Sequence, residues 1–251
     1  LAEVGELEQN YSTHLLQIGE KLEGYADTQR AILSQENPPF DVLLKRATSR
    51  AGMLWERQPT DDDFLGGRIG TATLPLSVDI KTLEDDDDPR IKAARDYVDA
   101  RRLVPALPVT VNLNKLGSAG IRGRRIESLY LAFHIIANLV VHHSPDDVHL
   151  YVISHRPDAP DLWDWARWLP HTAALRGAAP RISLRHETDE AVLESLAQQL
   201  RKREEQRRDR QNRRGESTPH LVVVFDQAPD LMGHQVIQLL LEHEPSHEEN
   251  R

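Results

Sequence analysis

The stretch AGIRGRRIESLYLAF, residues 119–133, decides the fold, because it places a glycine-bearing turn between an expected strand and an expected helix. An apolar stretch, LPVTVNL, precedes it, and a run with helical period, SLYLAFHIIANLVVHH, follows it. This order is typical of a phosphate-binding loop, in which backbone N–H groups at a helix N-terminus bind phosphate oxygens.

The turn departs from a complete phosphate loop, which reads G-x-x-x-x-G-K-[ST]. In that loop the Lys reaches the β- and γ-phosphates and the hydroxyl holds Mg²⁺. With Gly123 as the second glycine, Arg124 replaces the Lys and Arg125 replaces the hydroxyl residue. We therefore expect a vestigial nucleotide site, in which Arg124 still offers a cation to phosphate. Its candidate residues are Gly120, Gly123, Arg124, Arg125 and, on a later strand, Asp226.

That later strand is LVVVFDQ, residues 221–227, an apolar run that ends in acidic and amide residues. Asp226 stands where the metal-side carboxylate of an ATPase would be. Gln227 stands where the Glu that activates water would be, and an amide cannot take a proton at neutral pH. We therefore expect no catalytic residue and no ATP hydrolysis by this chain, while ATP with Mg²⁺ stays open as a ligand.

Strands and helices alternate through the rest of the chain, which predicts an α/β fold with a parallel sheet covered on both faces. Residues 1 to about 36 read as one long helix, in which apolar residues such as Ile18, Tyr25 and Ile32 recur every seven positions. That helix either lies on its own domain or pairs with a partner helix. We expect strands at 109–113, 146–154, 181–186 and about 220–226, a helix at about 126–143, and a helical stalk, 1–44, before an ATPase-like domain, 45–251.

Composition narrows the function classes. The chain has 251 residues, no cysteine and a formal net charge of −9, which argues against a dedicated nucleic-acid binder. No apolar run is long enough to span a membrane, and no secretory signal is visible. Because the chain begins at Leu1, we expect it to be part of a longer protein.

Other features have ordinary explanations. The acidic run at 84–89 reads as a solvated loop, and the basic run from Arg201 to Arg214 reads as a solvated helix end. His142 and His143, with the acidic pair after them, indicate a helix end and a turn rather than a metal site. Three tryptophans lie within six residues, and one helix cannot bury all of them on one face, so they are interface candidates: Trp163, Trp165 and Trp168.

Five motifs occur in the order found in a known family: LWERQPTDDDFLGGRIGTATLP, GIRGRR, HHSPDDVHLYVIS, WDWARWLPH and PHLVVVFDQ. Residues 45 to 232 thereby resemble the EccC/EssC proteins, membrane-bound FtsK/SpoIIIE-type ATPases of type VII secretion. The matched region is similar to the segment between the membrane helices and the tandem ATPase modules of that family.

The resemblance implies a RecA-like P-loop NTPase fold behind a cytoplasmic stalk, in a motor protein of a plasma or inner membrane. It implies a homo-hexamer, and as partners the other subunits of the secretion membrane complex and the downstream ATPase modules. It also implies a membrane connection through a preceding N-terminal segment. The departures at Arg124, Arg125 and Gln227 set this chain apart from the intact motor modules.

Three alternatives stay open. An active NTPase with an atypical site would need a metal ligand from elsewhere or an arginine from a neighbouring subunit. A pure interaction module would have a closed pocket, with Arg124 and Arg125 held by carboxylates such as Glu127 or Asp226. A part of a DNA translocase would need the basic run 201–214 to bind nucleic acid.

Overall fold

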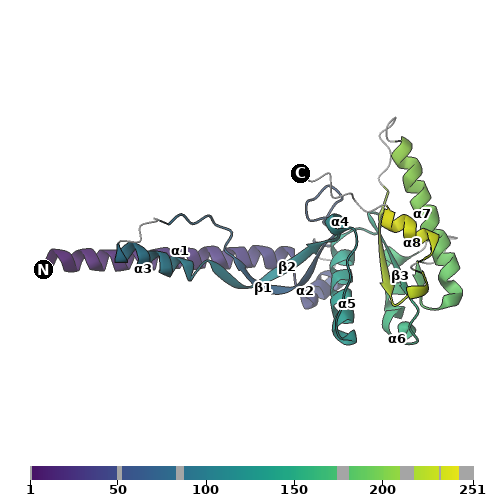
Figure 1. Ribbon diagram of the computed structural model, residues 1–251, viewed down its shortest axis with the longest axis horizontal. Coiled ribbons are helices and arrows are strands. Elements are labelled where there is room, and N and C mark those ends of the chain that lie inside the picture. Colours follow the sequence, from purple (N-terminus) through teal and green to yellow (C-terminus); the bar gives the residue numbers. More distant parts are fainter. Residues whose placement is uncertain are drawn as a thin grey trace. The chain divides into compact units, whose positions relative to one another are not determined.

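The structure, a computed structural model, describes residues 2–49, 53–82, 88–173, 181–209, 218–231 and 233–242. Its contacts divide the chain into two compact units, whose elements are labelled in Figure 1. The first unit comprises Leu1–Val42 and Arg68–Val111, and the second comprises Leu43–Gly67 and Asn112–Arg251. The expected division at residue 44 stays a prediction. Residues 84–87 of the acidic run lie outside the described residues.

The first unit is built on α1 (Ala2–Glu36), which confirms the long N-terminal helix expected from the sequence. Beside it lie α3 (Pro89–Asp99) and a two-stranded sheet of β1 (Gly66–Pro75) and β2 (Leu103–Asn112). The Asp88 side chain accepts a hydrogen bond from the Arg90 N–H and so caps the start of α3. One apolar core joins these elements: Leu22, Leu76, Val98, Val104 and Leu107.

The seven-residue pattern of α1 divides between two surfaces. Ile18 and Leu22 belong to the core with β1, β2 and α3, so α1 lies on its own unit. Tyr25 and Ile32 from the same pattern are half-exposed, and they leave an apolar stripe facing outward.

Residues 109–112 of the expected strand 109–113 lie in β2, whereas Leu113 begins α4 (Leu113–Leu116). Among the described residues β2 is paired with β1 and not with the strands of the parallel sheet. Ala106 has a φ of 59°, in the left-handed region, between the buried side chains of Val104 and Leu107. Val104 and Leu107, three positions apart, both belong to the core of the first unit, which departs from the regular alternation of a strand. The strand before the glycine turn is therefore present, but its expected place in the parallel sheet is not found among the described residues.

The second unit contains a parallel sheet in the order β4 (Ile182–Ser183), β3 (Val148–Ser154), β5 (His220–Asp226). Val152 is paired with Ile182 on one side and with Val224 on the other. The expected parallel arrangement of these three segments is confirmed. β4 is shorter than the predicted 181–186, because the Ser183 hydroxyl donates to Asp189 and the chain turns into a 3₁₀ helix.

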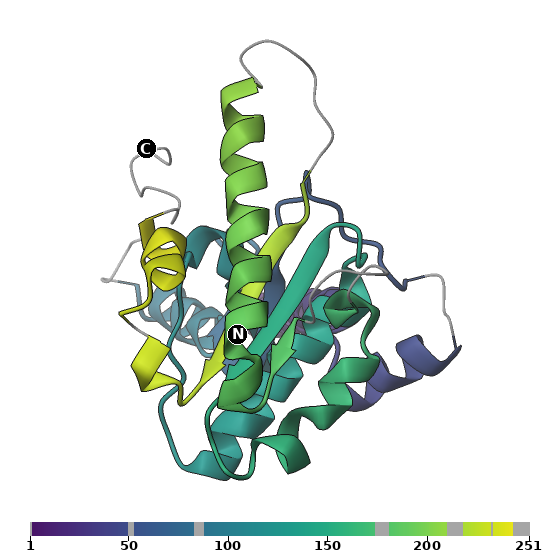
Figure 2. The same cartoon turned by 90° about the vertical axis from the view of Figure 1, so that its right-hand side faces the viewer.

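Helices cover both faces of this sheet, as the sequence predicts. Tyr151 and Ile153 pack against α7 (Asp189–Asp209) and α8 (Gln235–Glu242), and α7 crosses in front of the strands in Figure 2. Leu150 and Val152 pack against α5 (Arg125–His142) and α6 (Ala159–Trp163). The other elements are short: α2 (Phe40–Ser49), α4 (Leu113–Leu116), η1 (Asp164–Trp168), η2 (Pro170–Thr172), η3 (His186–Thr188) and η4 (Pro229–Leu231).

The end of α5 is held by buried histidines. His142 is the last residue of the helix, and its Nε2 lies 3.3 Å from Arg46 Nη1. His143 Nε2 accepts a hydrogen bond of 3.0 Å from the Leu65 N–H, while its Nδ1 lies 2.8 Å from the Leu139 carbonyl. These histidines mark a helix end, as expected, and the described residues contain no cluster of His and acidic side chains suited to a metal ion.

No helix among the described residues combines the length and the apolar character that crossing a membrane requires.

Candidate functional site

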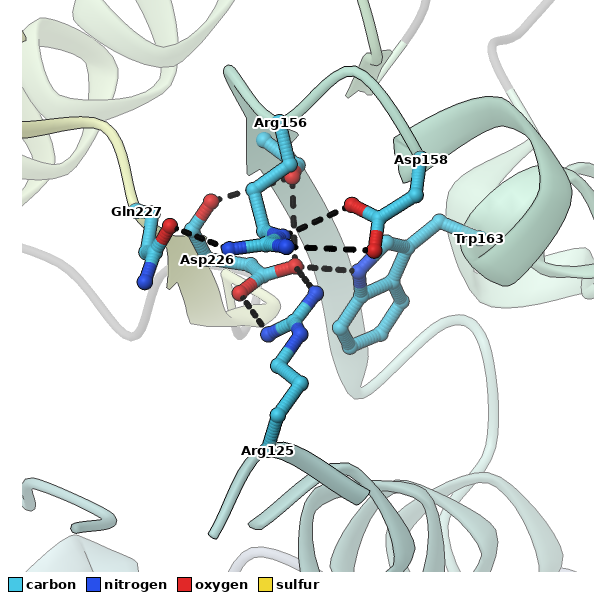
Figure 3. A network of polar contacts seen from close by, with 7 residues as sticks. Arg125, Arg156, Asp158, Trp163, Asp226 and Gln227 are labelled. Carbon is cyan, nitrogen blue, oxygen red and sulfur yellow. Dashed lines mark hydrogen bonds and ion pairs between the residues drawn. The ribbon is translucent and has the colours of Figure 1, made fainter. Parts of the chain in front are cut away.

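The structure brings together two residues that the sequence assigned to one site, Arg125 and Asp226. Arg125 is the first residue of α5, and Asp226 is the last residue of β5. The guanidinium binds the carboxylate through two bonds, Nη1 to Oδ1 at 2.5 Å and Nη2 to Oδ2 at 2.7 Å (Figure 3). Such a two-point pair is among the strongest charge-assisted hydrogen bonds in proteins.

Two further side chains donate to the same carboxylate. Trp163 Nε1, from the end of α6, lies 2.8 Å from Asp226 Oδ2. The hydroxyl of Ser154, at the end of β3, donates to the Asp226 carbonyl at 3.0 Å and to Oδ2 at 3.2 Å. Both oxygens of Asp226 are therefore occupied by protein donors, and its side chain is almost fully buried.

The electrostatics of Asp226 reflect a competition. Burial raises the pKa of its carboxyl, whereas the hydrogen bonds from Arg125, Trp163 and Ser154 and the Arg125 charge lower it. The second group prevails, so the pKa of Asp226 lies below its ordinary value. Asp226 is consequently an ionised carboxylate whose charge is balanced inside the protein.

A second arginine, Arg156, binds residues next to Asp226. Arg156, just after β3, donates from Nη1 to Gln227 Oε1 at 2.6 Å and from Nε to Asp158 Oδ1 at 2.7 Å (Figure 3). Gln227 has a φ of 53°, an uncommon backbone conformation for a residue other than glycine. The Gln227 amide, which the sequence analysis compares with a catalytic Glu, is thus hydrogen-bonded to an arginine.

The glycine turn itself is open to solvent. Arg124 lies at the start of α5 with its side chain largely exposed, and it pairs with Glu127 one turn later. Gly120 and Gly123 do not adopt left-handed φ values, and among the described glycines only Gly117 does so. A concave cluster of N–H groups that binds an anion generally needs such a conformation. Phosphate binding by residues 120–123 stays a prediction.

Protein donors occupy both carboxylate oxygens of Asp226. A metal ion at Asp226 would have to displace Arg125 and Trp163 from the two carboxylate oxygens. A phosphate near α5 would meet Arg124 on the surface, while Arg125 points to Asp226.

The sequence analysis did not predict three residues of the polar network around Asp226, namely Ser154, Arg156 and Asp158. A signal for them exists, because β3 and β5 are parallel neighbours and their carboxyl ends meet at one edge of the sheet. Ser154 is paired in register with Asp226, so the residues after Ser154 lie beside those after Asp226. The spacing of residues in the sequence does not indicate the contact between Arg156 and Gln227.

The three candidate interface tryptophans have different environments. Trp163 is buried and belongs to the site through its bond to Asp226. Trp165 is 37% exposed and Trp168 is 85% exposed, so two of the three reach the surface. Their role in an interface stays a prediction.

Comparison with known proteins gives relatives of one kind, although no family model matches the chain. The ESX secretion system protein EccC of Geobacillus thermodenitrificans is 24% identical over 237 residues, covering 92% of this chain and 16% of that protein. Its namesake from Thermomonospora curvata is 32% identical over 168 residues, covering 65% and 12%. The type VII secretion system protein EssC of Staphylococcus aureus is 24% identical over 245 residues, covering 94% and 16%. The chain thus spans only 12–16% of the length of these relatives.

Proposed function

We propose that this chain, a distant homologue of the EccC and EssC proteins of type VII secretion, is a non-catalytic segment of such a protein. In this proposal α1 and its sheet form a cytoplasmic stalk, and the second unit is an ATPase-like domain that does not hydrolyse ATP. The segment couples a membrane complex to ATPase modules elsewhere in the longer protein.

The observation that carries the proposal is the occupancy of Asp226. A carboxylate that serves a nucleotide-bound Mg²⁺ needs an oxygen available to the metal or to its water ligands. Here the two oxygens accept four hydrogen bonds from Arg125, Trp163 and Ser154. Opening the site would break a two-point ion pair of which the carboxylate is almost fully buried, and that is unfavourable.

The fold supports a relationship to RecA-like ATPases in part. A parallel sheet with helices on both faces places the end of β5 beside the start of α5, as an ATPase site requires. The two-stranded pairing of β2 departs from that plan, because the strand before a phosphate loop normally belongs to the parallel sheet. A degenerate rather than an intact site is consistent with both observations.

An assay of ATP hydrolysis tests the proposal. With Mg²⁺ and ATP in excess, we expect the same background rate from the wild-type chain and from Asp226→Ala. Turnover above background in the wild type that Asp226→Ala abolishes would overturn the non-catalytic assignment and favour an active NTPase with an atypical site.

A second candidate function, a pure interaction module, is favoured by the same ion pairs, because Arg124 and Arg125 are both held by carboxylates. Calorimetric titration with ATP, with and without Mg²⁺, separates the two candidates. Binding that Arg124→Ala removes supports a nucleotide site without turnover. The absence of both heat and a shift in melting temperature supports the interaction module.

A further inference from the structure

Two arginines lie near the amino ends of the parallel strands, at the opposite end of the sheet from Asp226. Arg181 comes directly before β4 and is only 7% exposed. Arg203 belongs to α7, and its Nη2 donates to the carbonyl of Pro219, which lies just before β5. We use the name basic cluster for these two arginines and His149, the second residue of β3.

Contacts within the second unit bring the members of the basic cluster together. Arg181 Nη2 lies 3.2 Å from His149 Nε2, and its guanidinium lies over the ring of Tyr151, 6.0 Å from the centroid. Burial, the Arg181 charge and the Arg203 charge lower the pKa of His149 from 6.5 to about 4. Tyr151 raises the pKa of both arginines, against the larger effect of burial. The two guanidinium groups therefore share His149 and Tyr151 as neighbours.

The charges of the basic cluster are not balanced within the described part of the chain. Arg181 donates to the His171 carbonyl at 2.9 Å and to His149, and neither it nor Arg203 contacts a carboxylate among the described residues. Burial lowers the pKa of both guanidinium groups. A buried lysine can lose its proton, whereas an arginine stays charged. Two buried cations without a counter-ion are unfavourable, so an anion bound here would stabilise the unit.

The basic cluster also has hydrogen-bond donors without a partner. Because Arg181 Nη2 donates, His149 Nε2 accepts, and the proton of the neutral ring is on Nδ1. Nδ1 is buried and has no hydrogen-bond partner among the described residues. The remaining N–H groups of Arg203 have no partner in that part of the chain either. The hydroxyls of Tyr151 and Ser195, 3.4 Å apart, are further donors. Guanidinium, imidazole and hydroxyl donors without a carboxylate are a set suited to an oxyanion.

We propose that the basic cluster binds a phosphate group, either inorganic phosphate or the phosphate of a small monoester. A phosphate monoester carries about −1.5 to −2 charges at pH 7, which matches two guanidinium groups, whereas a carboxylate balances only one of them. Arginine also suits phosphate because its planar donors contact two oxygens at once. The start of α5 and Asp226 lie at the other end of the strands, so the inference does not depend on whether the chain binds or hydrolyses ATP.

Calorimetric titration of the whole chain with inorganic phosphate, at pH 7 in chloride buffer, tests the proposal. We expect the wild type to bind, and Arg203→Gln and Arg181→Gln to bind at least about tenfold more weakly, because each loses a charge-assisted hydrogen bond to the anion. Arg185→Gln is the matched control, since Arg185 is exposed on the same segment as Arg181, and it is expected to bind as the wild type does. Arg124→Ala, which changes the glycine turn, is also expected to leave phosphate binding unchanged.

Two further titrations identify the source of the phosphate. Glycerol 3-phosphate that binds as tightly as inorganic phosphate would assign the site to the phosphate group of a larger molecule, and binding of inorganic phosphate alone would assign it to the free anion. Acetate that binds as tightly as phosphate would overturn the proposal. So would the absence of phosphate binding by the wild type, unchanged binding by both cluster variants, or a loss of binding only in Arg124→Ala. Because the wild-type titrations need no variant, the test holds even if Arg181→Gln does not fold.

Discussion

At the scale of single residues, Asp226 shows why an ion pair can fix a structure without adding much stability to it. The pair with Arg125 offsets the cost of burying the carboxylate, and the net gain over an apolar pair is small. Removing one partner is different, because the remaining charge keeps its burial and loses its compensation.

Arg125→Met is therefore expected to lower the free energy of unfolding by about 2–3 kcal/mol, measured by urea unfolding at pH 7. The double variant with Asp226→Asn removes the orphaned charge, and we expect it to recover part of that loss. If Arg125→Met leaves the stability unchanged, or if the double variant is the less stable of the two, the pair does not hold the end of β5 as described.

Gly66 and Gly70 form a second residue-scale comparison within one strand. A Cβ at Gly66 would lie 2.7 Å from the Asp63 carbonyl oxygen, whereas a Cβ at Gly70 would meet nothing within 4 Å. Gly66→Ala is expected to cost about 1–3 kcal/mol of stability, because backbone must move to admit the methyl group. Gly70→Ala is expected to stay within about 0.5 kcal/mol of the wild type, by the same urea titration. Equal effects would contradict the close approach at Gly66.

At the scale of elements, α1 buries one set of apolar side chains in the core of the first unit. A second set, Tyr25 and Ile32, stays half-exposed. Leu22→Ala is expected to lower stability by about 2–5 kcal/mol, because Leu22 is buried against β1, β2 and α3. Tyr25→Ala is expected to change it by less than about 0.5 kcal/mol, because that side chain is half-exposed. Circular dichroism during urea unfolding measures both.

The same pair of variants tests whether α1 pairs with a second helix. In that case the melting temperature would rise with protein concentration, and Tyr25→Ala would remove the concentration dependence. A helix that lies only on its own unit gives a melting temperature that does not change with concentration.

Periodicity predicted the long helices and the strands β3 and β5, because each has an apolar pattern of its own. It did not predict the partner of β2, since strand pairing depends on tertiary contacts that a local apolar pattern does not carry. In the site, Arg125 and Asp226 could be predicted from the order of elements in an ATPase. The contact of Arg156 with Gln227 depends on the backbone conformation of Gln227, which no sequence pattern indicates.

At the scale of the whole molecule, the second unit buries histidines next to arginines. We therefore expect its free energy of unfolding to fall at acidic pH. Burial, together with Arg57, Arg46 and His143, lowers the pKa of His142 from 6.5 to about 3. The pKa of His143 falls to about 4, chiefly through burial. In both rings Nε2 faces a donor, the Arg46 guanidinium or the Leu65 N–H, so protonation there would break a contact.

The sign of the pH dependence follows from these values. An unfolded chain takes up protons on its histidines as the pH falls through about 6.5, whereas folded His142 and His143 stay neutral until about 3 to 4. The unfolded state binds more protons between these limits, so stability is full above pH 6.5 and falls as the pH drops. Asp226 adds a loss only at lower pH, because the pKa of its carboxyl is lowered below its ordinary value.

We therefore expect His142 and His143 to lower the free energy of unfolding by about 4 kcal/mol from pH 7 to pH 5, at about 2 kcal/mol each. The pKa values of His149 and His220 also fall to about 4, so the total loss of the wild type is larger than this. His142→Gln keeps an acceptor for Arg46 and cannot titrate, so it is expected to reduce the slope by about 1.4 kcal/mol per pH unit below pH 6. Urea titrations at a series of pH values measure the slope. His14→Gln, at an exposed position on α1, is the control for the His-to-Gln substitution itself. A wild-type stability that stays flat from pH 7 to pH 5 would mean that His142 and His143 gain protons without leaving their contacts, and that acid does not act on this unit through them.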